Sequence, residues 1–115
     1  MLSLELLARQ LVEREGSDLH IAAGSPPMMR IDGRLIPAGE EKLSAEATRK
    51  LVYGILNSEQ VERFEQELEL DMSFGIEGLG RFRTNVFMQR EAVGSVLRVI
   101  PQETIPFAQL GLPSQ

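Results

Sequence analysis

Two alternating runs joined by a turn decide the fold, and they read GRFRTNVFMQREAVGSVLRVI over residues 80–100. Apolar side chains recur at every second position in both runs, which is the pattern of β-strands that have one face on a core. We predict strands at 81–88 and 93–100, with a turn centred on Arg90 and Glu91. A bulge in the second strand would shift the pairing between them.

This register sets two arginines directly opposite each other. Phe82 and its partner lie on the core side, so Arg83 faces Arg98 on the other side of the sheet. Like charges at such positions destabilise a sheet. Either nearby carboxylates such as Asp71 or Glu69 neutralise the two side chains, or the side chains bind an anion, since the guanidinium fork matches phosphate oxygens. The residues alone leave both interpretations open.

The rest of the chain predicts further helices and strands on either side of a tight hairpin. The hairpin turn is the dipeptide Asp32-Gly33, which tolerates positive φ angles. Periodicity and capping residues predict the other elements. They are a helix at about 3–15, a strand at 17–23, helices that begin after Ser44 and after Asn57 or Ser58, and a strand from Glu69 to Ile76. The fold class is α+β, a mostly antiparallel sheet of about six strands covered by about three helices.

Composition narrows the possible functions. The 115 residues carry 12 basic and 17 acidic side chains, a net charge of -5, with one histidine and no cysteine. Thiol chemistry is excluded, and a His-rich metal site or a histidine triad with a second histidine becomes improbable. The acidic total argues against nucleic acid as a partner. No apolar run approaches the roughly 20 residues of a membrane helix, so we expect a cytoplasmic protein with no transmembrane segment.

Other chemistry-bearing residues favour structural roles. His20 lies two residues from Asp18 on one strand, where the two side chains need not bond and no nucleophile accompanies them. Gly75, Gly78 and Gly80 do not fit a phosphate-binding loop, because the lysine and hydroxyl residue that should follow are missing. An arginine pair without such a loop could still meet a phosphate that another domain holds, as an arginine finger does.

Five segments, in order along the chain, resemble a known family. They are GSDLHI at 16–21, PPMMRIDG at 26–33, LDMSF at 70–74, GRFRTNVF at 80–87 and LRVIP at 97–101. Together they resemble the N-terminal domain of the type II/type IV secretion ATPases, most closely the PilT branch of pilus retraction motors. The resemblance implies a PAS-like domain over 1–101 and, over 102–115, the start of the linker to a C-terminal RecA-like ATPase domain.

The resemblance also implies a function and its residues. In this family, arginines on the strands that match the last two strands here face the ATP phosphates of a composite site in a hexamer. They correspond to Arg83 and Arg98, with Arg81 a weaker candidate because its strand partner is Ile100. The implied cofactors are ATP and Mg²⁺. The implied partners are the C-terminal ATPase domains of the same hexamer and the inner-membrane platform protein at the base of the pilus.

Alternatives stay open beside this prediction. The chain lacks the phosphate loop and acidic and histidine boxes of the family, so we expect it not to hydrolyse ATP alone. Assembly and type II secretion ATPases carry an additional N-terminal domain, and a first helix that begins near Met1 therefore favours the retraction branch. A free-standing PAS-like module that binds a ligand or protein is the alternative from another class, and it predicts an apolar pocket between sheet and helices.

Overall fold

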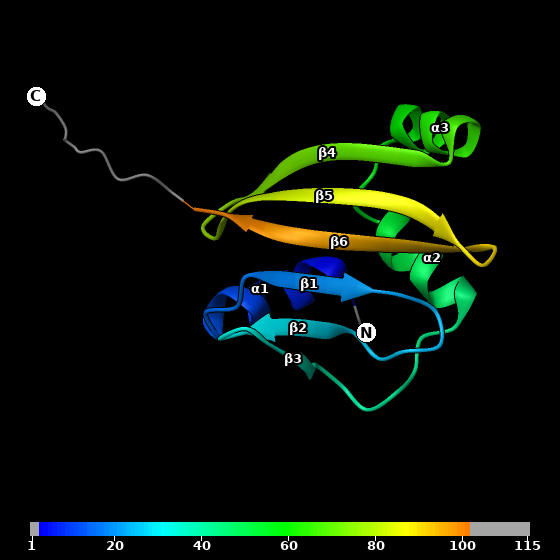
Figure 1. Cartoon of the computed structure of the whole chain (residues 1–115). Helices are drawn as coiled ribbons and strands as arrows, with labels where there is room; N and C mark the ends of the chain where they lie inside the picture. Colours follow the sequence, from blue (N-terminus) through cyan, green and yellow to red (C-terminus); the bar gives the residue numbers. More distant parts are fainter. Residues whose placement is uncertain (1–2, 102–115) are drawn as a thin grey trace, which may run out of the picture.

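One twisted antiparallel sheet with helices on one side makes up the protein (Figure 1). The computed structural model describes residues 3–101; the predicted linker at 102–115 lies outside them. The sheet order is β3-β2-β1-β6-β5-β4. The elements are α1 (Leu4–Glu13), β1 (Asp18–Ile21), β2 (Met28–Ile31), β3 (Arg34–Pro37), α2 (Ala45–Tyr53), α3 (Ser58–Glu67), β4 (Glu69–Ile76), β5 (Gly80–Gln89) and β6 (Ala92–Ile100). The predicted α+β class, six strands and three helices are confirmed.

The core fills the space between the sheet and the helices. α1 lies behind β1 and β2 in Figure 1, while α2 contacts β6 and α3 contacts β4. Apolar side chains on that side of the sheet are almost fully buried, and removing them from water is the main stabilisation of such a fold. They include Leu19, Ile21, Met29, Phe82, Val86 and Leu97. The opposite side of the sheet, which we call the open face, is covered by none of the helices of the described residues (Figure 1).

The register predicted for the last two strands is confirmed. Phe82 pairs with Val99 and Arg83 pairs with Arg98, with no bulge between β5 and β6. Arg90 and Glu91 form the turn with φ angles of 53° and 65°, which matches the twist of a two-residue hairpin. On the core side, the buried Thr84 and Ser95 hydroxyls lie 2.7 Å apart and satisfy each other where no water reaches them.

Capping fixes the helix starts, and backbone conformation fixes their ends. Ser3, Ser44 and Asn57 each accept a hydrogen bond from a first-turn amide, and Asn57 forms a complete capping box with Gln60. The first helix ends at Glu13 and not at 15, because Glu15 adopts a left-handed φ of 59°. The first strand is likewise shorter than predicted.

Glycine is required where the chain passes from α1 to β1. A Cβ on Gly16 would lie 2.6 Å from Leu11 Cδ1 and 3.0 Å from the carbonyl oxygen of Arg30. The close approach lets the next amide, that of Ser17, donate to the same Arg30 carbonyl at 2.9 Å. This bond joins the start of β1 to β2, and it sets Asp18 and Arg30 side by side on the open face.

Candidate functional site: the open face of the sheet

Strand pairing gathers most of the polar side chains of the sheet on the open face. One row crosses five strands, because the backbone pairs Arg30 with Asp18, Asp18 with Arg98, Arg98 with Arg83, and Arg83 with Ser73. Two groups of charges result. We call Asp18, His20 and Arg30 the Asp18 cluster, and Asp71, Arg83 and Arg98 the Asp71 cluster.

In the Asp71 cluster, one arginine is paired with a carboxylate. Arg83 Nη2 donates to Asp71 Oδ2 at 2.7 Å, and Arg83 Nε donates to Asp71 Oδ1 at 3.2 Å. These hydrogen bonds lower the pKa of the Asp71 carboxyl, and the same contact raises the pKa of the Arg83 guanidinium. Both side chains are exposed, so solvent screens the attraction. This ion pair is the neutralisation of Arg83 by Asp71 that the sequence left open as one of two interpretations.

Arg98 differs from Arg83 although the two lie opposite each other. Its neighbour on β1 is Asp18, but the contacts of that carboxylate go to other side chains. Among residues 3–101, the Arg98 guanidinium forms no ion pair and no hydrogen bond. Arg98 and Arg83 line one shallow hollow together with Asp71, Asn85 and Val96. The hollow therefore holds two guanidinium groups and one carboxylate, a surplus of positive charge that suits an anion.

Arg81 lies on the same face at the end of β5. It pairs with Ile100 on β6, as the register predicted, and its Nη2 donates to Ser73 Oγ at 3.3 Å. It lines a second hollow at the turn between β4 and β5 and not the one that Arg83 and Arg98 share. The structure thus brings Arg83 and Arg98 together and sets Arg81 apart.

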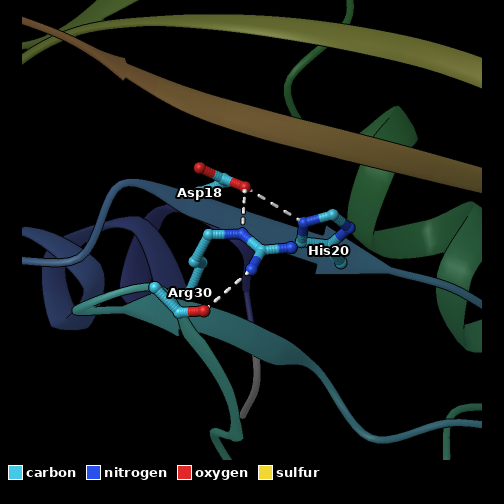
Figure 2. A network of polar contacts seen from close by, with 4 residues as sticks. Asp18, His20 and Arg30 are labelled. Atoms are coloured by element: carbon cyan, nitrogen blue, oxygen red, sulfur yellow. Dashed lines mark hydrogen bonds and ion pairs between the residues drawn. The ribbon is translucent and has the colours of Figure 1, made fainter.

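The Asp18 cluster is more enclosed, and here the sequence prediction needs a correction (Figure 2). His20 Nε2 lies 3.2 Å from Asp18 Oδ2, so the two side chains do bond although they are only two residues apart. Alternate residues of a strand lie on the same face, and here the carboxylate reaches along β1 to the imidazole. Arg30, which sequence reasoning missed, donates to the same oxygen from Nε at 3.3 Å and to the Gly33 carbonyl from Nη1 at 3.2 Å.

The Asp18 carboxyl stays ionised more readily than a free one. Its partial burial disfavours the charge, but hydrogen bonds from Ser17, His20 and Arg30 outweigh that penalty and lower its pKa. The sequence indicated which face of the hairpin Arg30 lies on, because a two-residue turn at Asp32-Gly33 fixes which hairpin residues share a face. The sequence did not indicate that the hairpin pairs with β1, since that pairing depends on a separate loop.

Residues 3–101 hold neither a metal-binding cluster nor a membrane-spanning helix. The described part of the chain contains no group of three His, Cys, Asp or Glu side chains that could hold a metal ion. None of its helices is long and apolar enough to cross a membrane. The hydrophobic core occupies most of the space between sheet and helices, where a ligand-binding module would place an apolar pocket. A hollow remains between α2, α3 and the β5–β6 turn, and its lining includes Tyr53, Phe64, Met88 and Val93. Another apolar hollow lies between α1 and α2, and its lining includes Leu4, Leu43, Leu51 and Ile55.

The fold matches that of a part of a known ATPase. The chain superposes on the Legionella pneumophila ATPase DotB with a TM-score of 0.73 at 22% identity, over 97% of this chain and 33% of that one. No protein-family model matches the chain. The likeness to DotB shows the fold.

Sequence identity narrows the class to the pilus ATPases. The chain is 41% identical to the type IV pilus ATPase PilU and 40% identical to the pilus retraction ATPase PilT, both of Pseudomonas aeruginosa, over 97% and 94% of its length. A crystal structure of the pilus retraction motor PilT with bound ADP matches with a TM-score of 0.82 over 98% of this chain and 33% of that one. The chain is thus homologous to a part of these pilus ATPases, and it spans about a third of their length.

Proposed function

We propose that this chain is the N-terminal domain of a hexameric ATPase that powers type IV pilus retraction. In this proposal, Arg83 and Arg98 reach the ATP phosphates of a composite site whose remaining parts come from C-terminal ATPase domains of the same hexamer. The similarity to PilT and PilU supports the motor, and the bound ADP of the PilT structure supports a nucleotide. The parent then binds ATP and Mg²⁺ and contacts the inner-membrane platform protein from the cytoplasmic side.

The observation that carries this proposal is the unequal charge of the hollow between β4, β5 and β6. Two arginines stand opposite each other with one carboxylate, and within the described residues that carboxylate pairs with Arg83 and not with Arg98. Keeping Arg98 next to Arg83 without a counter-charge costs stability in a sheet. A phosphate group supplies the missing negative charge and accepts hydrogen bonds from both forks. The described residues supply no metal-binding cluster, so ligands for Mg²⁺ belong to other parts of the parent.

The test is ATP turnover by the ATPase that carries this domain. We expect Arg83→Ala and Arg98→Ala each to lower turnover by about a thousandfold, because an arginine that stabilises the charge of a transferring phosphoryl group contributes that much. Arg9→Ala, on the exposed side of α1, is the matched control and should leave turnover unchanged. Thermal unfolding of the 115-residue chain checks that each variant folds. Normal turnover in both sheet variants contradicts the proposal.

A cell-based experiment separates retraction from the other roles of the class. Removing the gene that encodes the parent should abolish twitching motility while pili remain on the cell surface. Loss of the surface pili would instead assign the ATPase to pilus assembly, and a defect in protein secretion with normal pili would assign it to type II secretion. Complementation with the intact gene controls for effects on neighbouring genes.

A further inference from the structure

Among residues 3–101, the guanidinium of Arg83 uses only one of its two hydrogen-bonding edges. The edge formed by Nε and Nη2 meets both oxygens of Asp71, at 3.2 and 2.7 Å. Nη1 and the second hydrogen of Nη2 form the other edge, and Nη1 makes no hydrogen bond with another of the described residues. A planar guanidinium carries five N–H donors in a fixed arrangement. Asp71 can therefore hold Arg83 in place and leave three donors for a second anion.

The strand order makes Asp71 specific for one arginine of the pair. β5 lies between β4 and β6, so Asp71 on β4 is next to the strand of Arg83 and one strand removed from Arg98. Asp71 pairs with Asn85 through the backbone and reaches Arg83 along the diagonal of the ladder. On the core side of the sheet, β4 is packed through the buried Leu70, and the ring of Phe74 stacks on that of Phe82 of β5 with centroids 5.6 Å apart. The strand that carries the Asp71 carboxylate is thus packed onto the core through its other face.

We propose that Asp71 is a positioning residue for Arg83. It fixes the Nε–Nη2 edge, so that the other edge serves the hollow that Arg98 also lines, and the two arginines then meet the same phosphate group. Asp71 also offsets the repulsion between the paired guanidinium groups while no anion is bound. This inference rests on the proposed function, since it concerns how one of the two proposed arginines reaches the nucleotide.

The first test is a double-mutant cycle on ATP turnover by the complete ATPase. We expect Asp71→Asn, which keeps the size but loses the charge, to lower kcat by about ten- to a hundredfold, as loss of orientation does. The KM for ATP should change much less, because the nucleotide is bound mainly by other parts of the motor. In an Arg83→Ala background, Asp71→Asn should have no further effect, since residues that act through one another are not additive. Glu69→Gln, two residues away on the same strand and exposed, is the matched control.

The second test needs no nucleotide. In NMR spectra of the 115-residue chain, the Nε–Hε proton of Arg83 should exchange slowly with solvent, because it is held by Asp71. Asp71→Asn should speed this exchange, and Glu69→Gln should not. The same spectra show whether the variant is folded.

The outcomes separate the inference from the proposed function. If Arg83→Ala leaves turnover unchanged, the role of Arg83 in the ATP site fails. If Arg83→Ala impairs turnover but Asp71→Asn retains the wild-type kcat, or if its effect simply adds to that of Arg83→Ala, positioning by Asp71 is overturned. A rise in kcat for Asp71→Asn also overturns it, because Asp71 would then compete with the phosphate for Arg83.

Discussion

The two charged clusters of the open face each combine one aspartate with arginine, and they differ in the balance of their charges. In the Asp18 cluster, one half-buried carboxylate binds both an imidazole and a guanidinium through the same oxygen. In the Asp71 cluster, one exposed carboxylate binds one arginine, and a second arginine stands beside them with no partner among residues 3–101. The first arrangement satisfies its own charges and joins β1 to β2. The second retains a surplus of positive charge, which is the property that a phosphate site needs.

The largest difference between the two clusters is expected when an arginine is removed from each and ATP turnover is compared. In the complete ATPase, Arg98→Ala should lower ATP turnover by about a thousandfold, because Arg98 is the unpaired cation beside the proposed phosphate. Arg30→Ala should leave turnover within about twofold, since Arg30 is bound to Asp18 and Gly33 in its own cluster. Steady-state hydrolysis assays measure both. Equal losses in the two variants would remove the distinction between the clusters.

Removing the two carboxylates should have unequal effects on the free energy of unfolding. Asp18→Ala should lower the free energy of unfolding by about 2 kcal/mol, because it breaks hydrogen bonds to charged groups that are partly shielded from water. Asp71→Ala should change it little, since the pair with Arg83 is exposed to solvent. Urea unfolding of the 115-residue chain compares them. A larger loss for Asp71→Ala would show that the Asp71 cluster is the structural one.

A more stable variant of the chain would keep the variants above folded, so that their effects on activity could be measured without unfolding. Leu68 caps α3 in the left-handed region at a φ of 61°, and its side chain is 54% exposed. Leu68→Gly should raise the free energy of unfolding by about 1 kcal/mol, because glycine adopts this conformation without a Cβ penalty. The midpoint of thermal unfolding measures it, with Leu6→Gly inside α1 as a control that should destabilise the chain. A lower midpoint for Leu68→Gly would mean that the Leu68 side chain contributes more by packing than it costs in strain.

The smallest expected difference between the two clusters is in how much stability each loses as the pH falls. The pKa of Asp18 and that of Asp71 both lie below the usual value of 3.8 in the folded chain. A carboxyl with a lowered folded pKa stabilises the fold above its unfolded pKa, and that contribution is lost as the pH falls through the folded pKa. Stability should therefore decline below about pH 4, and Asp18→Asn should flatten the decline more than Asp71→Asn, because Asp18 is less exposed. Unfolding midpoints between pH 2 and pH 7 measure both slopes, and equal slopes would contradict the ranking.

Local patterns predicted most of the fold, and long-range pairing accounts for what they missed. The turn at Arg90 and Glu91 and the period of two fixed the β5–β6 register, because a two-residue turn leaves one alignment that buries one face. The bond between His20 and Asp18 and the part played by Arg30 were missed. Both depend on side-chain conformations and on how the hairpin docks against β1, which periodicity does not encode.

The sequence by itself determined that Arg83 and Arg98 face each other. That result needs only alternation and a short turn, which are properties of neighbouring residues. The tertiary structure decided which of the two arginines pairs with a carboxylate, because it placed β1 beside β6. Asp18 is the neighbour of Arg98 on β1 but is occupied by Arg30 and His20, while Asp71, on the strand before β5 in sequence, binds Arg83. Ion pairs form between side chains close in space, and only the packed sheet brings together β1 and β6, which are distant in sequence.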